Sequence, residues 1–218
     1  MANNLMTLRA HCDHILQKLP TRMDLNEESR TFLGEVAQGL LTRIEPLEKR
    51  ARKINDDPRL TLEGKQDQFV ELAKSAAHVV EPLVEQHKRV FDARLVLTHR
   101  VYPAPPVLTG TEAILQRMDF QEIRDAYRDK SQSERDSLYL QALQQNRPHI
   151  AQALLSAPTG SMITPEIVER AKVEDAKRRD PENFERLLIK GRLLDEMKAL
   201  LQHALQAVDN LKGYKNNL

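Results

Sequence analysis

Hydrophobic residues recur at spacings of three and four along most of the chain, and no segment alternates apolar with polar residues as a half-buried strand would. Asp24 is placed to cap a long helix whose apolar stripe comprises Phe32, Leu33, Val36, Ala37, Leu40, Leu41, Ile44 and Leu47. A second stripe comprises Phe69, Leu72, Ala73, Ala76, Ala77, Val80, Leu83, Val84 and Val90. The two stripes predict an all-α fold that contains two long amphipathic helices.

Each of these helices carries a proline inside its apolar stripe. The segment Ile44-Glu45-Pro46-Leu47 matches Val80-Glu81-Pro82-Leu83 at an offset of 36 residues. An internal proline removes one backbone hydrogen bond, so each helix should kink there. A tetratricopeptide array has a similar period, but only two copies occur here and each is one long helix. We therefore expect a long, kinked antiparallel hairpin over residues 24–101.

The clearest break in the helical pattern is residues 102–110, where three prolines fall within four residues. Such a segment cannot continue a helix and favours an extended path. It predicts an exposed connector between an N-terminal helical hairpin region, residues 1–101, and a C-terminal helical region, residues 111–218.

Shorter helices are expected around the hairpin. One precedes it, over residues 4–19, and ends at Pro20. Helical patterns after the connector, the third of them capped by Ser133, cover 111–118, 120–129, 134–145 and 148–155. Thr164-Pro165 and Asp180-Pro181 each place a cap residue before a proline, which predicts two further helices, the last a long C-terminal helix to about Leu211.

The long C-terminal helix has an apolar repeat of seven residues, which approaches the seam of a coiled coil over about three heptads. One interpretation is that this helix is buried in its own bundle. The other is that another subunit covers part of it. The second interpretation predicts an interaction surface formed by Leu187, Leu194, Met197, Leu201, Val208 and Leu211.

Opposite charges balance over the whole chain, which has 33 Lys and Arg against 32 Asp and Glu. Residues 1–110 hold 16 basic and 15 acidic side chains, and residues 111–218 hold 17 of each. This balance gives no reason to expect a polyanion as partner. No stretch approaches the ~18 apolar residues of a membrane span, and the first residues lack signal-peptide features, so we expect an intracellular protein.

Two short clusters depart from this balance. Each lies at the end of a predicted helix, where cations complement the helix dipole. The alternative is that they contact nucleic acid. The residues concerned are Lys49, Arg50, Arg52 and Lys53 in the first cluster and Lys177, Arg178 and Arg179 in the second.

Motifs for catalysis or for metal binding are scarce. His11-Cys12-Asp13-His14 places two histidines on one helical face, but no second cluster supplies further ligands at a recognisable spacing. The order His78-x-x-Glu81 is the reverse of the di-metal motif of helical bundles. The single cysteine excludes an intrachain disulfide. We expect no enzyme activity, no cofactor and no metal ion.

Three segments within residues 112–180 carry a resemblance: Arg117–Tyr127, Ser133–Asp136 and Ala153–Pro158. Together they resemble a part of uncharacterised helical proteins encoded among tailed-bacteriophage structural genes. The resemblance includes no catalytic motif and implies a virion or assembly component, located in the host cytoplasm or in the virion.

We therefore expect a non-enzymatic helical assembly or interaction protein that forms a homo-oligomer or a larger assembly with protein partners. The alternative is a small regulator whose two basic helix ends bind either nucleic acid or an enzyme that acts on nucleic acid.

Overall fold

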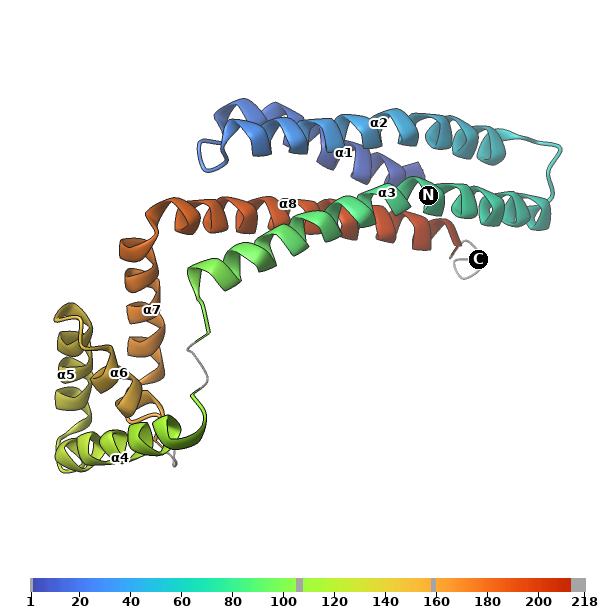
Figure 1. The fold of residues 1–218 in the computed structure, drawn as a ribbon. Coiled ribbons are helices and arrows are strands. Elements are labelled where there is room, and N and C mark those ends of the chain that lie inside the picture. Colours follow the sequence, from blue (N-terminus) through green and yellow to red (C-terminus); the bar gives the residue numbers. More distant parts are fainter. Residues whose placement is uncertain (1, 105–107, 158–159, 213–218) are drawn as a thin grey trace. The chain divides into compact units, whose positions relative to one another are not determined.

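The computed structural model describes residues 2–104, 108–157 and 160–212 (Figure 1). These residues form eight α-helices, one short 3-10 helix and no strand, which confirms the all-α class. The chain divides into two compact units. The first unit comprises residues 1–97 and 186–218, and the second unit comprises residues 98–185.

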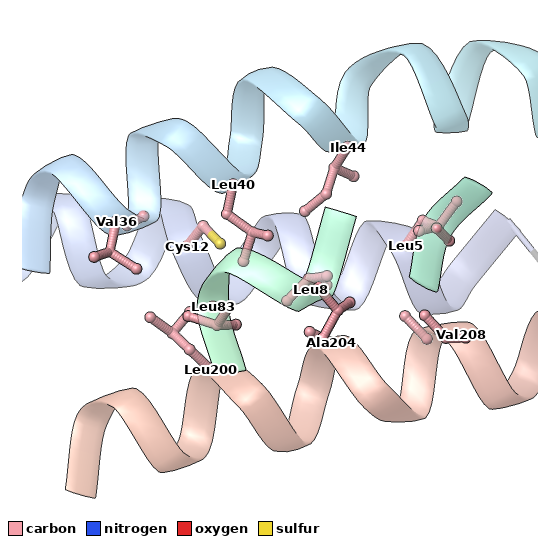
Figure 2. Packing of buried hydrophobic residues seen from close by; sticks show 14 of the residues in the cluster. Leu5, Leu8, Cys12, Val36, Leu40, Ile44, Leu83, Leu200, Ala204 and Val208 are labelled. Carbon is pink, nitrogen blue, oxygen red and sulfur yellow. The ribbon is translucent and has the colours of Figure 1, made fainter. Parts of the chain in front are cut away.

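Four helices build the first unit: α1 (Ala2–Lys18), α2 (Glu27–Asp56), most of α3 (Leu62–Val101) and most of α8 (Pro181–Lys212). The 3-10 helix η1 (Leu19–Thr21) links α1 to α2. All four helices contribute to one hydrophobic core. Figure 2 shows Leu8 of α1, Ile44 of α2, Leu83 of α3 and Ala204 of α8 pointing into this common interior.

The start of α2 differs slightly from the prediction. Asn26, rather than Asp24, is the cap, and its side chain accepts a hydrogen bond of 3.0 Å from the Ser29 backbone N–H. Glu27 and Glu28 follow in the first turn, where carboxylates complement the positive end of the helix dipole. Asp24 instead pairs with Arg22 in the preceding loop.

The two prolines that were expected inside helices are found there, Pro46 in α2 and Pro82 in α3. Neither proline ends its helix, although a proline inside a helix lowers the stability of that helix by about 3 kcal/mol. Ile44 is buried before Pro46 and Val80 is buried before Pro82, so hydrophobic packing next to each proline offsets this cost. The repeat seen in the sequence thus marks equivalent core positions in two helices.

The second unit contains α4 (Gly110–Tyr127), α5 (Gln132–Gln144), α6 (Pro148–Leu155) and α7 (Pro165–Arg179). Its smaller core comprises Tyr139, Ala151, Leu154, Ile163, Val168 and Ala171. Asp136 of α5 also holds the start of α7, because it accepts hydrogen bonds from the backbone N–H of Thr164 at 2.9 Å and from its hydroxyl at 2.6 Å.

Two local predictions in the second unit are wrong. The helices expected over 111–118 and 120–129 are one helix, α4, since no residue between them breaks the helical path. The cap of α5 is Ser131 rather than Ser133. Ser131 forms a capping box with Glu134, in which each side chain bonds the backbone of the other residue.

The division predicted at residues 102–110 also needs correction. Residues 111–218 do not form one region, because the part of the chain from residue 186 belongs to the first unit. The reason is that α8 supplies Leu193, Met197 and Leu200 to the core of that unit, where each is almost fully buried. Within the expected connector, residues 105–107 lie outside the described residues.

Candidate functional site

The interaction surface predicted on α8 is wrong, because most of its residues are buried inside the chain. Four of the six belong to the core of the first unit: Leu194, Met197, Val208 and Leu211. Leu201 packs against this core while partly exposed, and Leu187 is also buried. The seven-residue repeat of α8 therefore reflects packing against helices of its own chain.

Exposed apolar side chains gather instead on α4 of the second unit. None of the 18 residues of α4 is buried. Ile114 and Met118 are each 58% exposed and Leu115 is 55% exposed. At 100° per residue these three side chains lie on one side of the helix, and the partly buried Phe120 and Ile123 lie on the opposite side. The helix α4 packs against α6, so the outer α4 face, formed by Ile114, Leu115 and Met118, is left uncovered in the chain.

The first unit exposes a narrower apolar stripe on α3. Val84, Phe91 and Leu95 follow one another at spacings of seven and four, which places them along one side of the helix. Their exposed fractions are 42%, 48% and 46%. This stripe lies in the C-terminal half of α3, beyond Pro82.

A groove of about 530 Å³ lies beside the start of α2, between α2, α3 and α8. Its apolar lining includes Phe32 of α2, Val90 of α3 and Leu193 of α8. Its charged lining consists of Glu27, Glu28, Glu35 and Lys190.

One polar group in the lining of this groove has no partner. The hydroxyl oxygen of Ser29 is buried and makes no hydrogen bond within the described residues. Buried hydroxyl groups are nearly always hydrogen-bonded, so an unpaired one is unusual.

The first basic cluster lies at the exposed end of α2. Lys49 forms an ion pair of 2.7 Å with Glu45. Arg50, Arg52 and Lys53 are exposed, since the intervening residue of the helix, Ala51, faces the core. The cationic side chains of Arg50, Arg52 and Lys53 are therefore exposed to solvent at one end of the first unit.

The second basic cluster ends α7, in the second unit. Arg178 pairs with Asp175 at 2.9 Å, and Arg179 donates a hydrogen bond of 2.7 Å to the backbone oxygen of Val101. Lys177 is exposed. Two of the three cations thus bind groups of their own unit.

The histidine and cysteine cluster of α1 lies against α8. The ring of His11 is 4.4 Å from the ring of His203, measured between centroids, and its Nε2 is buried without a hydrogen-bond partner. Burial lowers the pKa of His11, and the neighbouring His203 lowers it further, whereas Glu196 raises it. His14 is exposed on the surface of α1.

Cys12 faces away from these histidines into the core, where it is fully buried. Burial raises the pKa of its thiol to about 12. A neutral, inaccessible thiol is neither a nucleophile nor a metal ligand at neutral pH. Across the described parts of the chain, His, Cys, Asp and Glu side chains form no group of three that could hold a metal ion.

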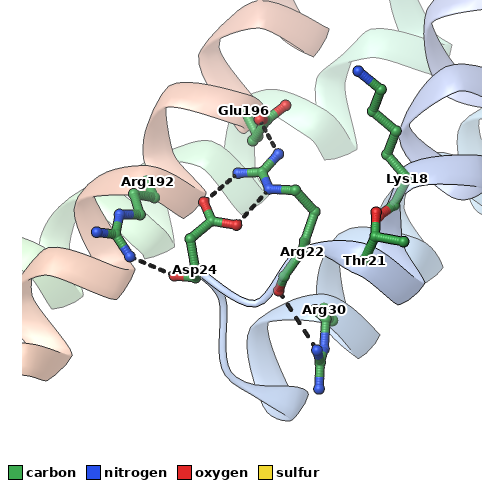
Figure 3. Close-up of polar contacts among 7 residues, drawn as sticks. All are labelled: Lys18, Thr21, Arg22, Asp24, Arg30, Arg192 and Glu196. Atoms are coloured by element: carbon green, nitrogen blue, oxygen red, sulfur yellow. Dashed lines mark hydrogen bonds and ion pairs between the residues drawn. The ribbon is translucent and has the colours of Figure 1, made fainter.

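A polar cluster fixes the loop between η1 and α2 to α8 (Figure 3). The Arg22 guanidinium donates hydrogen bonds to Asp24, at 2.7 and 2.9 Å, and to Glu196 of α8. Arg192 of α8 donates to the backbone oxygen of Asp24 at 2.8 Å. The hydrogen bonds from Arg22 lower the pKa of Asp24. All groups here have partners within the chain, so the cluster is a structural clamp.

Comparison with protein-family models, with curated proteins and with solved structures finds no match to this chain. In the described residues, no helix combines the length and the apolar character that crossing a bilayer requires.

The outer α4 face was missed from the sequence because α4 was divided into two short helices. Taken as one helix, residues 110–127 carry apolar side chains on two opposite sides, which is more than one packing contact needs. That double-sided pattern is the signal that predicts an uncovered face. The groove beside α2 has no such signal, since its lining comes from three helices distant in sequence.

Proposed function

We propose that this chain is a non-enzymatic helical assembly protein whose copies associate through the outer α4 face. We place it among the components of phage virions or of their assembly machinery, in the host cytoplasm or in the virion. The observation that supports association is the exposure of Ile114, Leu115 and Met118 on a helix that buries none of its residues. The phage context rests on the resemblance of residues 112–180, a range that includes this face.

A second copy of the chain is the partner that the outer α4 face suits. The three side chains are apolar and adjacent, so two identical faces related by a two-fold axis cover one another with apolar contacts. Burying apolar surface contributes about 25 cal/mol per Å². Exposed apolar patches on soluble proteins commonly mark interaction sites.

The test introduces charge into this face. Ile114→Glu with Met118→Glu places two carboxylates where the copies would meet, and desolvating unpaired charge is costly. Light scattering should show an oligomer for the wild type and a monomer for this variant, with unchanged helix content by circular dichroism.

The matched control is Ser137→Glu with Gln141→Glu, which adds two carboxylates at the same spacing of four residues to exposed polar positions of α5, in the same unit. This control should remain oligomeric. A wild type that is monomeric at high concentration, or a control that dissociates as readily as the test variant, contradicts the proposal.

The second candidate function is nucleic-acid binding at the end of α2, favoured by the exposure of Arg50, Arg52 and Lys53. It predicts binding to a duplex of about 24 base pairs that weakens steeply as salt rises. Replacing the three residues with Gln should abolish this binding. Absence of binding at low salt would exclude this function.

A further inference from the structure

The outer α4 face lies on a line of residues with the spacing of a helix–helix seam. Thr111, Ile114, Met118, Gln121 and Asp125 follow one another at alternating intervals of three and four residues. This alternation is that of the a and d positions of a coiled coil, which face a second helix. All five residues are exposed, so the chain leaves this seam uncovered along its whole length.

The seam is apolar at its centre and carries charge only at its last position. Ile114 and Met118 are the apolar members, and Leu115 lies beside them. The carboxylate of Asp125 is already paired within the chain, since it accepts a hydrogen bond of 2.6 Å from Arg128. A second helix along the seam therefore meets apolar side chains first.

Two side chains of opposite charge flank the seam, one on each side. From a line midway between Ile114 and Met118, Arg117 lies about 80° to one side and Glu122 about 60° to the other, at 100° per residue. Both are exposed, and neither has an ion pair or a hydrogen bond within the described parts of the chain. They are five residues apart, which is the spacing at which flanking residues of two parallel helices meet.

The positions of these two charges favour one orientation of a pair of α4 helices. In a parallel pair related by a two-fold axis, the arginine flank of each helix meets the glutamate flank of the other, and such flanking charges set orientation. Arg117 then pairs with Glu122 of the partner subunit, twice by symmetry. In an antiparallel pair each flank meets the same flank of the other helix, which brings like charges together at a cost.

We propose that two copies of the chain join through α4 helices that run parallel, and that Arg117 and Glu122 fix this orientation through two equivalent ion pairs. The inference rests on the proposed function and deepens it, because it identifies the arrangement of the copies and the residues that select it. Apolar contact holds the helices together, and the flanking charges decide how they align.

Charge reversal tests the pairing. Arg117→Glu alone, or Glu122→Arg alone, turns two attractive contacts into two repulsive ones and should weaken dimerisation, measured by analytical ultracentrifugation, by about fivefold or more. The double variant Arg117→Glu with Glu122→Arg restores both ion pairs and should recover most of the wild-type affinity. Lys177→Glu is the matched control, because it makes the same change of net charge at an exposed position of α7. It should associate like the wild type.

Cross-linking measures the orientation directly. Thr111→Cys and Gln121→Cys, made separately, place a thiol at each end of the seam. In a parallel pair both residues face their own counterparts, so both variants should form disulfide-linked dimers under mild oxidation. In an antiparallel pair at most one of them can, because residues ten positions from the axis lie about 30 Å apart. The wild type is the control, since its only cysteine, Cys12, is buried.

Three outcomes overturn the parallel arrangement: a single reversal that leaves the affinity unchanged or raises it, a double variant that stays weak, or a disulfide in only one cysteine variant. If Ile114→Glu with Met118→Glu still dissociates the oligomer in that case, self-association through the outer α4 face stands and only the orientation is refuted. A monomeric wild type refutes both.

Discussion

At the scale of single residues, the side chains of α1 that most resembled catalytic or metal-binding residues contribute to packing instead. Cys12 is fully buried and its thiol has a pKa of about 12 because of that burial. Its neighbour His11 packs on His203 of α8. The sequence placed these residues on a helix, but it gave no information on which helix would cover them. The contact with α8 joins residues that are almost 200 positions apart.

The burial of Cys12 predicts its reactivity. In the folded protein at pH 8, a thiol reagent such as DTNB should react far more slowly than with a free thiol, because the thiol is both inaccessible and protonated. In denaturant one thiol per chain should react at once. Rapid reaction of the native protein would show that α1 is not packed as described.

The lowered pKa of His11 predicts a dependence of stability on pH. Because the folded pKa lies below the ordinary value of 6.5, the unfolded chain binds more protons between these two values. Stability is therefore complete above about pH 6.5 and falls as the pH drops towards the folded pKa. The charged groups acting on His11 are His14 on its own helix and His203 and Glu196 on α8.

Urea midpoints at pH 8 and pH 5.5 measure this effect. The wild type should lose stability at the lower pH, and His11→Gln should lose less. The acid sensitivity of Asp24, whose pKa is also lowered, belongs to a separate window below its ordinary value of 3.8. Equal loss in the wild type and in His11→Gln would contradict the assigned role of His11.

At the scale of elements, the periodic positions were predictable and the helix ends were less so. The stripes of α2 and α3 identified core residues such as Leu33, Ile44, Leu72 and Leu83. The boundaries depended on which of several nearby polar residues bonds the backbone. Asn26 rather than Asp24 caps α2, since Arg22 holds the Asp24 carboxylate elsewhere. Such competition depends on which side-chain contacts form in the fold, here an ion pair between residues two positions apart that Glu196 of α8 also joins.

The cap of α5 offers a direct test. Ser131→Ala should lower the free energy of unfolding by about 1 kcal/mol, because it removes the side-chain acceptor of the capping box. Ser133→Ala, two residues along, should change it by no more than about 0.5 kcal/mol, as surface substitutions do. Thermal denaturation of both variants measures the difference. The reverse order would mean that Ser133 is the cap.

The packing of α8 has a second test. Leu194→Glu with Leu201→Glu puts one charge in the core of the first unit and a second at the edge of that core, and uncompensated burial of charge is strongly destabilising. The variant should lose a large part of its helical circular dichroism signal. If it instead stays folded and only its subunit number falls in light scattering, α8 contacts another subunit after all.

At the scale of the whole molecule, the chain returns to its first unit after building the second. The sequence favours two successive regions, because it shows where the proline-rich segment lies but not which distant segments pack together. The seven-residue repeat of α8 looks the same whether its partner is another subunit or a helix of the same chain. Only the packing of Leu193, Met197 and Leu200 with α1, α2 and α3 distinguishes the two.

The central claim is that copies of the chain associate through the outer α4 face. Hydrogen exchange of the wild type at about 1 μM and about 200 μM tests it most directly, since this range spans the micromolar affinities of moderate self-association. The account predicts that amides around Ile114–Met118 exchange more slowly at the higher concentration, while those of α8 do not change. Exchange in α4 that is independent of concentration, or protection that appears in α8 instead, would contradict it.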